Sequence, residues 1–161
     1  MSDFLVRAGV AALAAGWFMA AQAGELSPPT VSDGVVTVRS AYQVNETVDR
    51  LKRAIAEKGI TFFGTVDQSK LGADAGVTVR PSMLLIFGNP GLGVQFLGGN
   101  PLAGLDWPVR VLVLQDADGQ VWTAYSDFAW IARRHHIINR DAVFAKASAV
   151  ITAINDSIRA E

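Results

Sequence analysis

Apolar residues along the chain follow two kinds of spacing, which predict strands and helices in turn. The β-branched run at residues 35–38 predicts a first strand. Apolar residues then recur at helical spacing from Val44 to Ile55, with Asn45 as the expected N-cap and Gly59 as the terminator. The later pattern predicts strands at 60–66, 83–87, 109–114 and 121–125, and helices at 67–75, 90–97, 128–135 and 143–158.

The connections between these elements indicate the fold class. The Asp118-Gly119 pair between the last two strands predicts a hairpin, and the other crossovers are too short for an all-parallel sheet. We therefore expect an α+β domain, with a mainly antiparallel sheet of about five strands and two longer helices packed on one face. The other face must be covered by short helices or by a second subunit.

The N-terminus has the pattern of a signal peptide over residues 1–23. Arg7 supplies a cation, residues 8–20 are almost wholly apolar, and Ala21-Gln22-Ala23 resembles a cleavage site. Residues 24–33 are expected to form a linker and residues 34–161 a single domain. The apolar run is shorter than the ~20 residues that span a bilayer, so we favour a periplasmic or secreted protein over a retained anchor.

Charge and composition exclude several classes of function. The 161-residue chain has a formal net charge of −1, which disfavours a nucleic-acid partner. It has no cysteine, so disulfides, thiol catalysis and thiolate metal sites are ruled out.

The middle of the chain, roughly residues 47–137, resembles domain-of-unknown-function family 302. Several separated motifs carry the resemblance: Val48-Asp49-Arg50-Leu51, Lys58-Gly59, Val66-Asp67, Leu84-Leu85-Ile86-Phe87-Gly88-Asn89-Pro90, Gly93, Leu105-Asp106-Trp107-Pro108-Val109-Arg110, Asp116-Ala117-Asp118-Gly119-Gln120-Val121-Trp122, Tyr125-Ser126-Asp127 and Arg134-His135.

The resemblance implies a TATA-binding-protein-like β-α-β(4)-α arrangement, without DNA binding, and is compatible with a homodimer. It implies no activity. The chain departs from the family pattern at Gln68, where histidine is common, at Val94, where threonine is common, and at His136, where glycine is usual.

Some polar motif residues could form an acid, base and cation set if the fold brings them together: Asp67, Asp106, Arg110 and His135. Each also has an ordinary structural interpretation. Asp67 suits a helix cap, Asp106 a turn, Arg110 an ion pair, and His135 a helix C-terminus. The sequence alone favours these structural roles.

Other motifs are weaker. The loop at residues 88–93 leads into a helix start that could hold an anion, but its glycine spacing fits no known phosphate loop. Asp116 and Asp118 are better explained by a hairpin than by a calcium loop. The adjacent His135 and His136 do not share a helix face and so would not chelate one ion. We therefore expect no metal, and no cofactor is expected either. Late aromatic residues, among them Trp107 and Trp122, fit a core or an interface better than a ligand cleft.

Three hypotheses follow. The favoured one is an exported module that binds a small organic or anionic ligand near Asn89, Asp106, Arg110, Tyr125 and His135. The second is an enzyme that uses Asp67, Asp106 and His135. The third is a structural protein whose aromatic-rich face joins two subunits.

Overall fold

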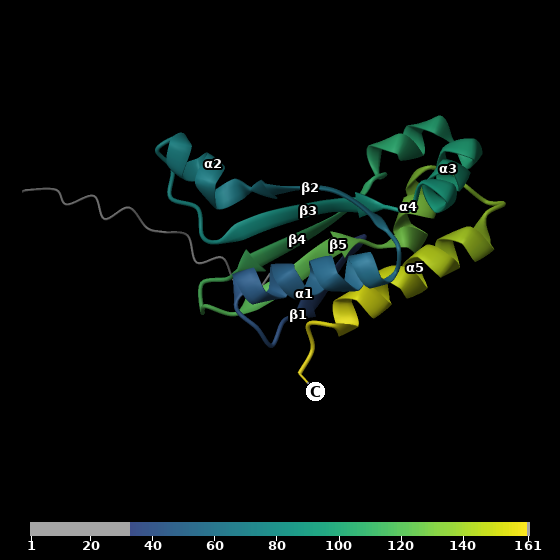
Figure 1. Ribbon diagram of the computed structural model, residues 1–161. Helices are drawn as coiled ribbons and strands as arrows, with labels where there is room; N and C mark the ends of the chain where they lie inside the picture. Colours follow the sequence, from purple (N-terminus) through teal and green to yellow (C-terminus); the bar gives the residue numbers. More distant parts are fainter. Residues whose placement is uncertain (1–32, 161) are drawn as a thin grey trace, which may run out of the picture.

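The computed structural model describes residues 33–160, which form one antiparallel sheet with helices around it (Figure 1). The strand order is β1-β5-β4-β3-β2, and every neighbouring pair is antiparallel. The elements in chain order are β1 (Val35–Arg39), α1 (Val44–Glu57), β2 (Thr61–Asp67), α2 (Gln68–Asp74), β3 (Ser82–Gly88), α3 (Pro90–Gly99), the 3-10 helix η1 (Pro101–Leu105), β4 (Val109–Gln115), β5 (Val121–Ser126), α4 (Phe128–Arg134) and α5 (Asp141–Asp156).

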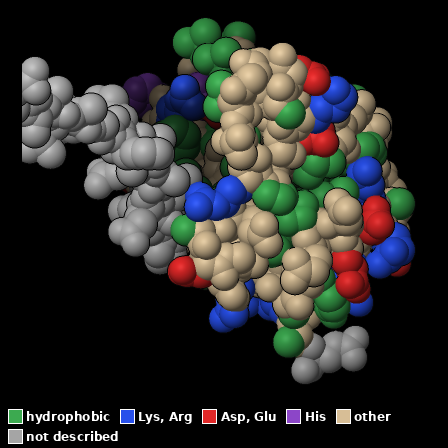
Figure 2. Space-filling view, turned by 90° about the vertical axis from the view of Figure 1, so that its left-hand side faces the viewer, with side chains coloured by type: hydrophobic (Ala, Val, Ile, Leu, Met, Phe, Trp, Pro, Cys, Tyr) green, Lys and Arg blue, Asp and Glu red, His purple; other side chains and the backbone are tan. Residues whose placement is uncertain are grey.

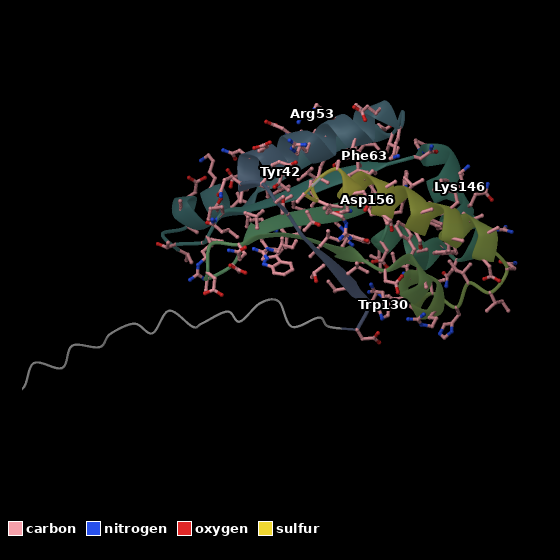
Figure 3. All side chains as sticks on the ribbon, turned by 90° about the horizontal axis from the view of Figure 1, so that it is seen from below. Tyr42, Arg53, Phe63, Trp130, Lys146 and Asp156 are labelled. Carbon is pink, nitrogen blue, oxygen red and sulfur yellow. The ribbon has the colours of Figure 1, made fainter. Side chains whose placement is uncertain are left out.

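The two long helices, α1 and α5, cover one face of the sheet. They lie below the strands in Figure 1 and nearest the viewer in Figure 3. Their apolar stripes bury Leu51 and Ile55 of α1 and Ile154 of α5, each at most 1% exposed, against alternate strand residues such as Leu85 and Val111. Every second residue of the strands and one stripe of each long helix thus pack together in a single core, as the spacing of the apolar residues predicts.

The shorter helices begin at side-chain caps that the sequence contains. Asp67 caps α2, Asn89 caps α3 with Pro90 at the first helical position, and Asp127 caps α4. Each cap accepts a hydrogen bond from a backbone N–H that the first helical turn leaves unpaired. The helix α1 is different, because it begins after Gln43 without a side-chain cap, so the expected capping role of Asn45 is wrong.

The second face of the sheet carries none of the long helices. The strand register places eight apolar residues there, which we call the open face: Val35, Val66, Leu84, Ile86, Leu112, Leu114, Trp122 and Ala124. All eight are half-buried, whereas residues of the covered face such as Leu85, Val111 and Val113 are fully buried. Figure 2 shows hydrophobic side chains at the surface in the upper part of the molecule, the part from which α2 rises.

The predicted fold is confirmed: the domain is α+β, with five antiparallel strands and two long helices on one face. The predicted signal peptide and all of the predicted linker except Asp33 lie outside the described residues.

Candidate functional site

Three of the predicted site residues meet at one end of the sheet. The His135 Nε2 atom lies 2.6 Å from Asp106 Oδ2, and both side chains are only 4% exposed. Arg134 Nη1 donates to both carboxylate oxygens at 3.2 and 3.1 Å. Arg110 lies farther away, with its Nη2 atom 3.6 Å from Asp106 Oδ1. The sequence-derived set of an acid, an imidazole and a cation is therefore brought together in part.

Local structure explains this convergence. Asp106 is the C-cap of η1, and His135 is the C-cap of α4, so both side chains leave helix ends that meet. Asn100 Nδ2 donates to the His135 carbonyl at 2.8 Å, and Arg110 Nη2 donates to the Leu105 carbonyl at 2.9 Å. These bonds fix the segment between α3 and β4 against α4.

The chemistry of the Asp106–His135 pair is that of a buried, hydrogen-bonded bridge. A carboxylate taken out of water needs donors, and here imidazole and guanidinium groups supply them. Because both side chains are almost wholly enclosed, a ligand has little access to the pair. The geometry favours a positioning role for this pair over contact with a substrate.

The other predicted site residues lie elsewhere. Asp67 is opposite Met83, which pairs with Val113 near the end of β4, whereas Asp106 precedes the start of β4. The sheet therefore separates Asp67 from the Asp106–His135 pair, and the three-residue enzyme site is not assembled. Hydrogen bonds from the Ser69 hydroxyl and the Lys70 N–H to Asp67 lower the pKa of its carboxyl.

Tyr125 also lies apart from the Asp106–His135 pair. It sits on the covered face of β5, between Val36 and Val111, and is 9% exposed. Burial raises the pKa of Tyr125, an effect that the Thr152 hydroxyl partly offsets. Its grouping with the ligand-binding candidates is not supported by this placement, because its side chain packs under α5.

Asp116 closes the β4–β5 hairpin. Its Oδ1 atom accepts from the backbone N–H groups of Asp118 and Gln120, and its Oδ2 atom accepts from the Trp122 indole at 2.7 Å. The hydrogen bond from the Trp122 indole is the largest of the effects that lower the pKa of the Asp116 carboxyl. This carboxylate is fully used by the turn, and residues 33–160 contain no cluster of three or more metal-ligating side chains.

A cleft between α3 and α5 brings Asn89 into a different setting. We call it the α3 cleft. Its inner part is an apolar cavity of about 30 Å³, lined among others by Phe87, Phe96, Trp107 and Ile151. Its outer part is an open groove of about 510 Å³ whose charged lining residues are Lys58 and Lys146. Four residues line both parts and join them: Ile60, Asn89, Leu92 and Val150.

The sequence fits this cleft in detail. A Cβ atom at Gly93 would lie 2.1 Å from Trp107 Cε2, so only glycine lets α3 approach the indole this closely. Lys58 is the C-cap of α1, and Lys146, labelled in Figure 3, lies early in α5. Both line the outer groove together with Gly91 and Leu92 of α3. Nothing in the local sequence pattern marks Lys146 as a site residue, and Lys58 stands out only as part of the Lys58-Gly59 motif.

Comparisons with known proteins give the family and little about chemistry. The chain is 35% identical over 138 residues to the "Fluoride-specific ion channel FluC 1" of Brucella suis biovar 1, covering 82% of this chain and 54% of that protein. It is 35% identical over 138 residues to "FluC 2" of Brucella melitensis biotype 1, covering 82% of this chain and 51% of that protein. The chain thus spans about half the length of the curated relatives it matches. No helix within residues 33–160 has the length and apolarity that a membrane crossing requires.

A solved structure shows the same fold. The "uncharacterized conserved protein DUF302 from Bacillus stearothermophilus" superposes with a TM-score of 0.72 at 19% identity, covering 80% of this chain and 100% of that one. The family described as "Domain of unknown function DUF302" matches residues 36–157. On these grounds the chain belongs to the DUF302 family, whose function is uncharacterised.

Proposed function

We propose that this domain is a binding module for a small organic anion, held in the α3 cleft by its charge at the mouth and by a short apolar group inside. The observation that carries the proposal is the continuity of the apolar cavity with a groove whose charged lining residues are both lysines. A pocket with mostly apolar walls and a few polar groups at one side is the usual form of a small-molecule site.

The polar groups at the mouth favour negative charge. Lys58 and Lys146 contribute two cations, and the groove contains no acidic side chain. α3 begins at Pro90, and Asn89 and Gly91 at this helix start line the groove. The Gly91 N–H has no intrahelical acceptor, and the N-terminal end of a helix carries a partial positive charge. A carboxylate here would meet both lysines and this N–H.

The size of the inner cavity limits the apolar group. A volume of about 30 Å³ is two or three times what one water molecule needs by the same measure, ~10–15 Å³. Short-chain carboxylates therefore match the cavity, whereas a long acyl chain would have to displace Phe96 or Ile151.

The test is a ligand series measured by thermal unfolding and calorimetry. The series runs from acetate to hexanoate, with sodium fluoride as a second arm because the relatives named above are fluoride channels. A ligand that binds only the folded state raises the unfolding temperature as its concentration exceeds Kd. We expect affinity to rise with chain length up to the size of the cavity and then to fall.

Matched variants locate the site. The double variant Lys58→Gln/Lys146→Gln is expected to weaken binding more than tenfold, whereas Lys70→Gln on α2, outside the cleft, is expected to leave it unchanged. Ala147→Leu, which fills the inner cavity, should remove the dependence on chain length. Equal binding by the double variant and the parent would overturn the proposal. Stabilisation by fluoride alone would replace the organic anion with an inorganic one.

We also propose that the chain is exported. The support is the cation, the apolar run and the small-x-small site within residues 1–23. The mass of the protein recovered from an exporting host tests this directly. A mature chain beginning near Gly24 supports export, and the full-length mass in the cytoplasm contradicts it.

A further inference from the structure

The open face is an apolar surface that the described helices leave uncovered. Leu112 and Leu84 lie at its centre on β4 and β3, and Ala124 lies beside Leu112 on β5. The two ends of this face are marked by hydrogen bonds to neighbouring segments. The Ser82 hydroxyl donates to Gln68 of α2, and Arg110 donates to the Leu105 carbonyl of η1.

The charges on this face are already engaged within the chain. Arg110 contacts Asp106 and the Leu105 carbonyl. Arg39 donates to Gln120, and its charge lies close enough to Asp116 to help lower the pKa of that carboxyl. An acidic partner would therefore gain little from Arg110. Arg39 lies on the edge strand β1 and its hydrogen-bond partner Gln120 is neutral, so its exposed guanidinium must stay at the solvated rim of an apolar contact.

The size of the open face suits a contact between two sheets. Strands ~4.8 Å apart and about 20 Å long give five strands a footprint of roughly 400 Å². A stable interface buries about 800 Å² on each partner. Exposed apolar side chains at the two ends can supply the rest, namely Leu71 and Val77 at 57% exposure and Leu102 and Leu105 at 65% exposure.

We propose that the open face binds the open face of a second copy of this chain and forms a two-fold symmetric dimer. A sheet that is apolar on both sides needs a cover on this face, either short helices or a second subunit. A contact across a two-fold axis uses the same patch on both partners, so an apolar face can pack against its own copy. Two such sheets pack about 10 Å apart with interdigitating side chains. Trp122 is the natural anchor, because its indole N–H is already bonded to Asp116 and its ring remains available for apolar contact.

The absence of cysteine from the chain gives a direct experiment. In the full chain, Ala124→Cys places a single thiol at the centre of the open face, and Ala129→Cys places one on the exposed side of α4. Maleimide labelling rates are measured from about 1 to about 100 µM protein beside sedimentation velocity, a range that brackets micromolar Kd values. We expect a concentration-dependent dimer in which labelling at position 124 slows at least tenfold, while labelling at position 129 stays constant.

A pair of charge substitutions completes the test. Leu112→Glu is expected to give a monomer, and Ile138→Glu, at a side chain 88% exposed away from the strands, is expected to leave the dimer intact. A monomer at every concentration overturns the proposal, as does a dimer that survives Leu112→Glu. Protection of position 124 in a chain that sediments as a monomer also overturns it, because another segment of the same chain then covers the face. If Leu112→Glu fails to fold by circular dichroism, the labelling series decides alone.

Discussion

Removing the Asp106 carboxylate is the sharpest test of how the segment between α3 and β4 is held. Asp106→Ala deletes an acceptor that His135 contacts at 2.6 Å and Arg134 at 3.1 Å. The His135 side chain is only 4% exposed, so its ring nitrogen loses a buried hydrogen-bond partner when the carboxylate is removed. Leaving a buried donor without its hydrogen-bond partner costs about 1–3 kcal/mol.

The arginine contacts add little to this cost. The Arg134 and Arg110 side chains are 44% and 49% exposed, so water screens their attraction to Asp106. Exposed ion pairs contribute about 0–1 kcal/mol each. We therefore expect Asp106→Ala to lower the free energy of unfolding by about 1–3 kcal/mol, most of it through His135. Asp106→Asn, which keeps one acceptor oxygen, should cost less.

Urea unfolding, monitored by circular dichroism, measures the loss in free energy of unfolding. Double-mutant cycles then separate the contribution of His135 from that of Arg134. A domain of this size has about 5–15 kcal/mol of stability, so the variant should still fold. The coupling energy between Asp106→Ala and His135→Ala should exceed about 1 kcal/mol, and that between Asp106→Ala and Arg134→Ala should stay below it. A loss of less than about 1 kcal/mol for Asp106→Ala, or the reverse order of couplings, would refute the account of a buried bridge.

Three further perturbations follow from single residues. Gly93→Ala should destabilise the fold by about 1–3 kcal/mol, because its Cβ would clash with Trp107. Gly98→Ala in the same helix is the control: its Cβ would meet nothing within 4 Å, so it should stabilise the fold by up to ~1 kcal/mol. Thermal unfolding of both variants measures the difference. His136→Gly should raise stability by about 1 kcal/mol, since φ at this position is 52°, and an unchanged or lower unfolding temperature would contradict this. Burial raises the pKa of Tyr125, so the unfolded state releases this proton first and stability should fall above about pH 10; Tyr125→Phe should make that fall smaller in urea titrations at alkaline pH.

The fold could be predicted from the sequence because each element carries a local signal. The period of the apolar residues distinguishes β4 from α5, and Asp118-Gly119 specifies the hairpin. The family departure at His136 also has a structural explanation. The backbone there is left-handed, which is the conformation that favours the usual glycine.

The candidate site could be predicted only in part, because convergence depends on tertiary structure. Asp106 and His135 meet because η1 and α4 end at the same place, a fact that no spacing in the sequence reveals. Tyr125 is instructive in the opposite way. Residues 121–125 are Val-Trp-Thr-Ala-Tyr, so the positions that alternate with Tyr125 are also apolar, and only the structure shows that Tyr125 shares the buried side of β5 with Val121 and Thr123.

The segment at residues 105–110 links the features that the domain uses. Asp106 forms the buried bridge, Trp107 lines the α3 cleft, and Arg110 lies on the open face. Changes within this segment should therefore disturb cleft and face together and cannot separate their roles. Lys146 contributes to the cleft alone and Leu112 to the open face alone, so substitutions at these two positions can distinguish ligand binding from dimer formation. If Leu112→Glu loses the dimer but keeps its ligand affinity, ligand binding and dimer formation are independent. If it loses both, the segment at residues 105–110 couples the α3 cleft to the open face.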